Sequence, residues 1–357
     1  MAIETREDLQ EHLQWAMQVE LSTIPTYLYA MYSIEDEHSD PYKLVRSIVV
    51  EEMLHTALVA NLNVAIGGQP AFYDEAVMPS YPMDLPHHKP PLRLNLQPCS
   101  IEFIEGVCMP IEHPRPVDGL PEDDDYETIE QFYLAVEHAI ESLDQREPLF
   151  ETPRVARQMM DPSYYAPVEF DVEESGGLRP VTDLESACLA VETVIHQGEG
   201  LRDEHWADPG HHELTHYYKF KQIADGTYPL GTVRPVPTNP TRDDFDPALR
   251  PVAELFDAVY SYTFVLMDEI YSTTDREEKD ALVANLYVLM SGVLGRIARY
   301  LTSRPAADDT DVRAAPTFEF YRFEEPSKAA TEIRELAAAV ASNHEELAII
   351  ETLVKRL

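Results

Sequence analysis

The segment Val49 to Asn63 reads VVEEMLHTALVANLN, an apolar run interrupted by two glutamates and a histidine. Glu52 and His55 are three residues apart, and residues at this spacing are neighbours on one face of a helix. They occupy the vacant positions of an apolar stripe formed by Ile48, Val59, Leu62 and Ile66. A charge on a core-facing stripe is costly unless it is paired or bound to a metal. The segment therefore predicts a buried helix with a polar site in its middle.

A second Glu-x-x-His pair, Glu213 and His216, leads into another helical stripe with Phe220 and Ile223. Because a Glu-x-x-His match also arises by chance, its surroundings must decide. Glu35 and His38 have the same spacing but lie in a polar turn, so we exclude them. Glu20 lies within the first stripe of the chain, which consists of Leu9, Leu13, Ala16, Ile24, Tyr27 and Met31.

A third helix is predicted from the stripe Leu184, Cys188, Val191 and Ile195, which leads to Glu199. Glu192 and Glu199 are two turns apart on one face, and both could reach a central site. Glycines flank Glu199 and favour close approach of helices, so we choose Glu199 and hold Glu192 in reserve. Glu51 lies about 100° from the stripe of its helix, and we expect it to face solvent.

Taken in chain order, these acids are one Glu, one Glu-x-x-His, one Glu and one Glu-x-x-His. Dinuclear iron or manganese sites in four-helix bundles are built from this set of groups. We therefore predict two iron ions, with manganese as the alternative. Glu52 and Glu213 would bridge the ions, Glu20 and Glu199 would be terminal ligands, and each histidine would hold one ion. The metal ligands would be Glu20, Glu52, His55, Glu199, Glu213 and His216. The alternative is a buried carboxylate–histidine network without metal.

Helical periodicity divides the chain into two parts. Residues 1–232 form a predicted bundle domain with a proline-rich insert, 69–180, in which only IEQFYLAVEHAIESL reads as a helix. Residues 233–357 form a predicted helical extension that packs on the bundle. We expect the stretch from Gln69 to Asp125 to cover one end of the bundle and to shape a substrate pocket. The fold class is all-α.

Composition limits the functional classes. The chain carries 65 acidic and 27 basic residues, a net charge of -38, which disfavours nucleic acid and anionic membranes as partners. Its longest apolar window, ALVANLYVLMSGVLG, falls short of the about 20 residues of a membrane span. The amino terminus lacks the pattern of a secretion signal. We therefore expect a cytoplasmic protein with a small-molecule substrate, and nothing in the sequence predicts its oligomeric state.

Several ordered segments between Met1 and Thr232 resemble the ferritin-like family associated with iminophenyl-pyruvate dimer synthase. The segments are MQVELSTIPTYLYAMYSI, VVEEMLHTALVANLNVAIGGQP, YPMDLPHHKPPLRLNLQPCSIEFIEGVCMPIEHP, IEQFYLAVEHAIESL and HQGEG with ELTHYYKFKQI. That family includes a domain of enzymes in bisindole pigment assembly, which couple amino-acid-derived imines oxidatively.

The resemblance implies a ferritin-like four-helix bundle with helical additions, and it supports the six predicted ligands position by position. We therefore expect a metal-dependent, di-iron oxidoreductase that acts on a small organic substrate such as an amino-acid-derived imine. The alternative is a non-catalytic metal-binding or partner-binding protein with the same bundle. Iron storage is less favoured, because the long insert and the extra helices would hinder assembly of a cage.

Overall fold

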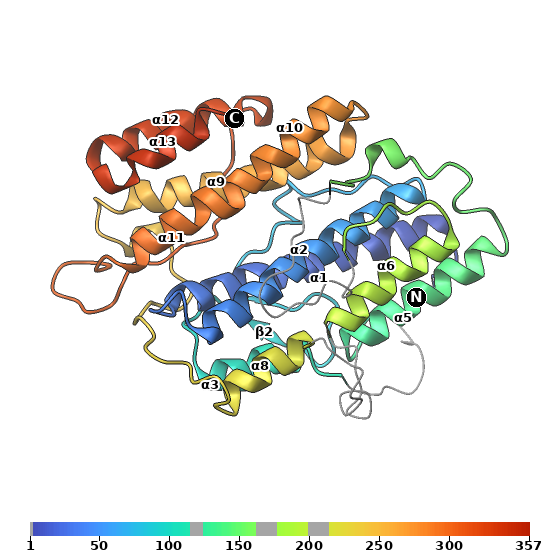
Figure 1. The fold of residues 1–357 in the computed structure, drawn as a ribbon, viewed down its shortest axis with the longest axis horizontal. Helices are drawn as coiled ribbons and strands as arrows, with labels where there is room; N and C mark the ends of the chain where they lie inside the picture. The colour runs from blue at the N-terminus through green and yellow to red at the C-terminus, as the bar shows by residue number, and fades with distance from the viewer. Residues whose placement is uncertain (1–2, 115–123, 162–176, 199–213) are drawn as a thin grey trace.

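The computed structural model describes residues 3–114, 124–161, 177–198 and 214–357, and Figure 1 shows a bundle of helices. Its centre is an antiparallel pair, α1 (Arg6–Ser33) and α2 (Asp40–Ala65). The Thr5 side chain starts α1 by accepting the Asp8 N–H, while the Asp8 carboxylate accepts the Thr5 N–H. Ser39 caps α2, whose first turn contains Pro41. Most residues of both helices are buried, so this pair forms the core of the molecule.

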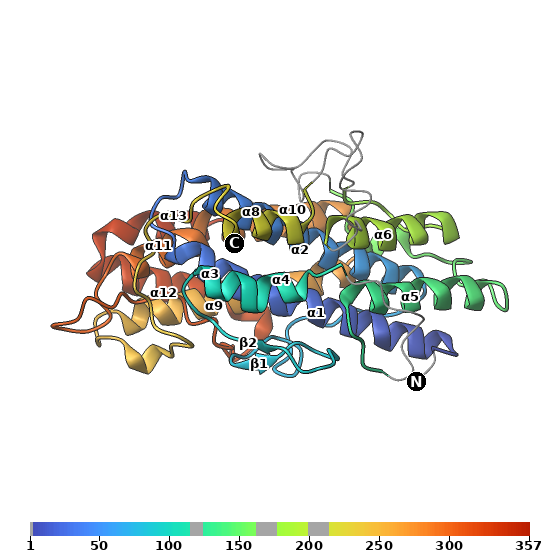
Figure 2. The same cartoon turned by 90° about the horizontal axis from the view of Figure 1, so that it is seen from below.

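Two lines of helices complete the bundle on one side of this pair. One consists of α3 (Ile101–Phe103), the π-helical turn η1 (Ile104–Cys108), α4 (Met109–Ile111) and α5 (Ile129–Asp144). The other consists of α6 (Leu184–Gln197) and α8 (His216–Ala224). Figure 2 shows α3, α4 and α5 following one another along the bundle, with α8 and α6 forming the neighbouring line.

The proline-rich insert therefore contributes more to the bundle than its sequence predicted. The helix expected at IEQFYLAVEHAIESL is present as α5, but the segment from Ile101 to Ile111 is also helical and packs against α8. The expectation that Gln69 to Asp125 covers one end of the bundle is wrong for Ile101 to Ile111, because this segment is itself one of the bundle's helices. Pro110 lies one residue before the end of this helical run, shortly after the π-helical turn η1, so it does not interrupt the run.

The rest of the insert holds a short antiparallel hairpin, in which β1 (Met83–Asp84) pairs with β2 (Arg93–Leu94). The chain that follows α2 is fixed to the carboxyl-terminal helices by two hydrogen bonds. The backbone N–H groups of Phe72 and Tyr73 donate to the carboxylate of Asp268, each over 2.9 Å.

The carboxyl-terminal third is helical, as expected, and lies on the other side of α1 and α2 (Figure 1). Its helices are α9 (Arg250–Ser272), α10 (Arg276–Tyr287), the π-helical segment η5 (Val288–Leu294), α11 (Gly295–Thr302), α12 (Ala329–Asn343) and α13 (Ala348–Val354). This third also contains two short 3-10 turns, η6 (Pro326–Lys328) and η7 (Glu345–Leu347). Two further 3-10 turns, η2 (Val155–Arg157) and η4 (Arg242–Asp244), lie earlier in the chain. Contacts between α11 and α1 join this part to the bundle. The division at residue 232 stays a prediction.

Among the described residues, two helices are long and apolar enough to cross a membrane by length and composition alone. They are α2 and the continuous run from Arg276 to Thr302, which spans 27 residues and is longer than its apolar window suggested. The apolar window of α2 is 89% buried within the bundle and that of the second helix 44%. One or two such helices are weak evidence for a membrane span, because core helices have the same length and composition.

Candidate metal centre

Three predicted residues meet between α1 and α2. Glu20 projects from α1, and Glu52 and His55 project from one face of α2, where the spacing of three residues places them one turn apart. The Nδ1 atom of His55 lies 3.5 Å from Glu20 Oε2 and 3.5 Å from Glu52 Oε2. All three side chains are buried. One oxygen from each carboxylate and one imidazole nitrogen thus converge on a common point.

A second group of three forms around the other oxygen of Glu52. His216, the first residue of α8, places Nδ1 3.4 Å from Glu52 Oε1 and 3.4 Å from Glu112 Oε2. Within each group, one candidate ligand atom per residue lies within 4.8 Å of the others, at a spacing that could hold a metal ion. Glu52 belongs to both groups, with one oxygen directed to each. The two imidazole rings lie side by side, with centroids 5.4 Å apart.

Both histidines are oriented by a hydrogen bond to Nε2, the ring nitrogen that faces away from Glu20, Glu52 and Glu112. His55 Nε2 is 3.0 Å from Gln197 Oε1, and His216 Nε2 is 3.0 Å from Glu51 Oε2. Each Nδ1 is therefore left to point at the carboxylates, an arrangement typical of metal-binding histidine.

The buried Nδ1 of His216 has no hydrogen-bond partner in the described part of the chain. Two ligand atoms that are each about 2.1 Å from one ion lie about 3.0–3.4 Å apart, close to the spacings around Nδ1. The donor set of carboxylate oxygen and imidazole nitrogen suits iron or manganese. The residues present therefore fit a metal centre.

Glu51 is buried, which corrects the expectation that it faces solvent. Its side chain and that of Lys219 on α8 are both 0% exposed and form a short ion pair with Nζ 2.5 Å from Oε2. The expectation was wrong because α2 is covered by α8 on the side that the apolar stripe leaves free. The carboxylate of Glu51 thereby connects a buried lysine to the imidazole of His216.

Two tyrosines contact the carboxylates from the outside. The Tyr27 hydroxyl donates to Glu112 Oε1 over 2.6 Å, and the Tyr133 hydroxyl on α5 donates to Glu20 Oε1. In each case the bonded oxygen is the one that does not face histidine. The hydrogen bonds fix the rotation of both carboxylates and leave Oε2 of each directed inward.

A small cavity of about 10 Å³ adjoins the two groups and is lined by Glu20, Glu52, His55, Glu112 and His216 together with ends of α5 and α6. Gly198, directly after α6, forms part of this wall. A Cβ atom there would lie 3.3 Å from the carbonyl oxygen of Val194 and 3.8 Å from Glu112 Oε2. Glycine therefore lets the end of α6 approach the carboxylates closely.

Without metal, the centre retains protons. Burial, together with the neighbouring carboxylates of Glu20 and Glu112, raises the pKa of Glu52 to about 8. Burial would lower the pKa of His55, but contacts with Glu20 and Glu52 outweigh it and raise that pKa to about 9. Burial would also raise the pKa of Glu51, but Lys219 and His216 lower it to about 2. The positive charges of His55 and Lys219 and the proton on Glu52 thus offset the negative charge of the other buried carboxylates.

The structure brings together four of the six residues predicted from sequence: Glu20, Glu52, His55 and His216. The other two, Glu199 and Glu213, lie outside the described residues. Glu192 is exposed on α6, so the reserve assignment to it is wrong. Glu112 was missed, although it follows Ile104 and Cys108 at intervals of four residues. The spacing of Ile104, Cys108 and Glu112 indicates a helix, but the prolines around this stretch argued against one.

A helical bundle that buries carboxylates and histidines around a shared glutamate defines a class of helical proteins with a candidate metal centre. A family model described as ferritin-like matches residues 13–225, and the chain belongs to the ferritin-like family. The crystal structure of a ferritin-like protein from Caulobacter vibrioides is similar, with a TM-score of 0.57 and 25% identity, over 83% of this chain and 98% of that one. No curated protein gives a significant match.

Proposed function

We propose that this protein binds two metal ions, iron in the first instance, and is an oxidoreductase that acts on a small organic substrate. The observation that carries the proposal is the position of Glu52, whose two oxygens face two separate carboxylate–histidine groups. A carboxylate with this placement bridges two ions in dinuclear centres of helical bundles.

The charges favour two cations over none. Glu20, Glu52 and Glu112 carry three negative charges when deprotonated, and all are nearly inaccessible to water. Two divalent ions would neutralise them and replace the protons that the metal-free centre holds. Glu20 and His55 would hold one ion, Glu112 and His216 the other, and Glu52 both. Glu199 and Glu213 stay predicted ligands.

The chain itself provides orientation and a confined space. Gln197 and Glu51 hold the two imidazole rings with Nδ1 inward, while Tyr27 and Tyr133 hold the outer oxygens of two carboxylates. Such partners raise metal affinity and set the geometry of the ligands. When bound, the iron pair supplies electrons for the reduction of dioxygen. The small cavity beside it is lined by the same carboxylates and imidazoles.

The substrate class rests on the resemblance to the family of iminophenyl-pyruvate dimer synthase. We propose an amino-acid-derived imine, oxidised in the cytoplasm, as the substrate. Coupling two imine-derived molecules through one new bond breaks one bond to hydrogen in each and releases two electrons and two protons, which dioxygen would accept to give hydrogen peroxide.

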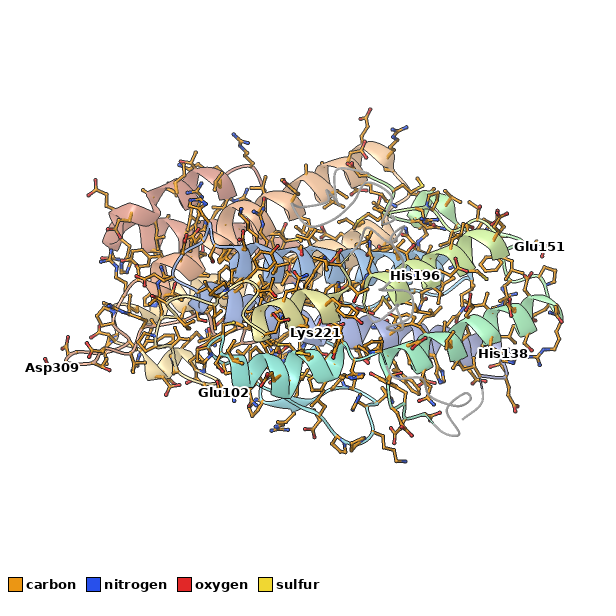
Figure 3. The ribbon with its side chains drawn as sticks, turned by 60° about the horizontal axis from the view of Figure 1, so that its bottom comes forward. Glu102, His138, Glu151, His196, Lys221 and Asp309 are labelled. Atoms are coloured by element: carbon orange, nitrogen blue, oxygen red, sulfur yellow. The ribbon has the colours of Figure 1, made fainter. Side chains whose placement is uncertain are left out.

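Oxygen uptake tests this proposal. Protein loaded with ferrous ion would be supplied with an aromatic amino acid and an amino-acid oxidase, with catalase present, and uptake would be compared with that of the oxidase alone. We expect extra oxygen consumption and a coupled product, both abolished in His55→Ala and His216→Ala. His196→Ala is the matched control, because His196 is exposed on α6 (Figure 3).

Loaded protein that neither consumes oxygen nor forms product with aromatic imines would reject the imine substrate. A parent protein that retains no iron or manganese would reject the metal centre as well.

A further inference from the structure

One long helix of the carboxyl-terminal third is apolar but only partly buried. It runs without a break from Arg276 through η5 to Thr302, and α10 and α11 mark its two ends in Figure 1. Only 44% of its apolar window is buried, compared with 89% for the apolar window of α2. A contiguous apolar surface that is left in water marks a site of association.

The outward side of this helix is formed by small and aromatic residues in its middle. The exposed residues there are Ala281, Ala284, Tyr287 and Ser291, and their spacing of three or four residues places them on one side of the helix. Tyr287 is 52% exposed, more than any other large apolar side chain of the described residues. Ile349 of α13, which packs against η5, is 45% exposed. The exposed apolar surface thus extends over two helices.

The middle of this helix is also free of acidic residues. The chain has 65 acidic residues among 357, but none between Ala281 and Ala307. Two copies of a chain with a net charge of -38 repel each other over most of their surfaces. The middle of this helix differs, because it carries no carboxylate that would oppose the approach of a second copy.

The two ends of the helix carry opposite charges. Glu277, Glu278 and Asp280 are exposed near its amino-terminal end, and Arg296 is exposed towards its carboxyl-terminal end. Asp280 lies 3.8 Å from Arg276, but this ion pair is exposed and contributes little to stability. The helix therefore offers a negative end, an uncharged middle and a positive end on its outward side.

An antiparallel pairing of this helix with its own copy matches these charges. In a two-fold interface, if one residue faces a second residue of the other copy, the second also faces the first. Asp280 and Arg296 are equally far along the chain from Val288, so an axis at Val288 sets Asp280 of each copy against Arg296 of the other. Because the π-helical turns of η5 are wider than α-helical turns, both residues stay on the outward side.

Composition and size also favour an interface between copies. Interface cores are enriched in aromatic residues, Met and Arg and depleted in Asp, Glu and Lys. The helix presents Tyr287 in its middle, with the half-buried Met290 one turn away and Arg296 near the end. Its 27 residues span about 40 Å. A strip of that length and about 20 Å wide, two helix diameters, covers about 800 Å², the area that one subunit contributes to a standard interface.

We propose that this protein forms a two-fold dimer in which the helix from Arg276 to Thr302 packs antiparallel against the same helix of a second copy. Tyr287 lies beside the axis, and Asp280 of each copy faces Arg296 of the other. None of the candidate metal ligands belongs to this interface, so the dimer does not depend on the metal centre.

Sedimentation equilibrium of the metal-free full chain tests this proposal. At about 0.15 M salt the Debye length is about 8 Å, which screens the long-range repulsion between two acidic copies. Tyr287→Asp places a carboxylate beside the axis. Leu134→Asp is the matched control, because Leu134 is 42% exposed on α5, on the other side of the α1–α2 pair. Asp280→Arg and Arg296→Asp reverse the two charges separately, and the double variant exchanges them.

We expect a dimer for the parent and for Leu134→Asp, and a dissociation constant at least about tenfold higher for Tyr287→Asp. Each single charge reversal should raise the dissociation constant about tenfold, because it places like charges opposite each other. The double variant should restore the parental value, because the exchanged charges again face each other.

The proposal is overturned if the parent sediments as a monomer at about 100 μM, if Tyr287→Asp dimerises like the parent, or if the double variant is as weak as the single variants. A monomeric parent that binds vesicles of phosphatidylglycerol and phosphatidylcholine, with no binding by Tyr287→Asp, would assign this face to a membrane instead of a second copy.

Discussion

The α1–α2 pair separates two regions with opposite chemistry. On one side Glu20, Glu52 and His55 form a buried charged centre, and on the other Leu21 and Met53 line an apolar cavity. Successive residues of a helix point about 100° apart, so one step along the chain is enough to change sides. Both sides are covered, one by α6 and α8 and the other by the carboxyl-terminal helices (Figures 1 and 2). A buried helix can therefore carry a polar site and an apolar site at the same height along its axis.

The largest expected effect is on the charged side, in the pair of Lys219 and Glu51. Lys219→Met leaves the Glu51 carboxylate buried beside His216 with no cation of fixed charge, which should lower the free energy of unfolding by about 3–5 kcal/mol. Urea denaturation of metal-free protein measures this change. Lys221→Met, on the exposed face of the same helix (Figure 3), is the control and should change it by less than about 0.5 kcal/mol.

A double variant sharpens this prediction. Adding Glu51→Gln to Lys219→Met removes the stranded charge and should restore much of the lost stability. If Lys219→Met and Lys221→Met had equal free energies of unfolding, the buried ion pair would not hold α8 against α2.

On the apolar side, a substitution should change stability without changing metal binding. Leu286→Ala removes a buried side chain from the wall of the cavity and should lower the free energy of unfolding by about 2–4 kcal/mol. Metal analysis and urea denaturation on the same preparation measure both properties. Loss of metal from a folded Leu286→Ala protein would contradict the separation of the two sides.

Glu112 tests the boundary of the charged centre. Glu112→Gln removes one negative ligand beside His216 and should weaken binding of one of the two ions by about 100-fold, leaving the ion at Glu20 and His55. Competition with a chromophoric chelator measures both affinities. Glu105→Gln, an exposed glutamate in the same helical segment, should bind like the parent. If Glu112→Gln and Glu105→Gln bound metal with identical affinities, Glu112 would not be a metal ligand.

The proton content of the centre predicts a pH dependence. Glu52, with a pKa of about 8, and His55, with a pKa of about 9, are protonated at pH 7 in metal-free protein, and metal must displace these protons. Apparent affinity for manganous ion should therefore rise by at least about tenfold per pH unit between about pH 6 and 7.5. Calorimetry in buffers of different ionisation enthalpy measures the protons released. Binding without proton release would contradict this account of the metal-free state.

The sequence predicted the positions that follow from periodicity. Glu20, Glu52 and His55 stand at vacant places in apolar stripes, and the structure places them together as that pattern indicates. The all-α ferritin-like bundle and its carboxyl-terminal helices are confirmed. Helical geometry is local, so a stripe identifies the buried face without knowledge of the partner helix.

The sequence was a poor guide where the environment depends on distant segments. Glu51 was expected in solvent because the stripe marks one buried face, but a stripe does not reveal that α8 covers another. Glu112 was missed because prolines surround a helix of only a few turns, whose stability comes from packing on α8. Its pairing with His216, 104 residues later, cannot be read from spacing.

The stoichiometry of metal binding decides whether the centre holds two ions. Metal-free protein would be titrated anaerobically with ferrous ion, and Glu52→Gln would be titrated in parallel, because Glu52 faces both groups. We predict two ions per chain for the parent and loss of tight binding at both positions in Glu52→Gln. A parent that binds no iron, or a Glu52→Gln protein that still binds two ions with parental affinity, would contradict a dinuclear centre bridged by Glu52.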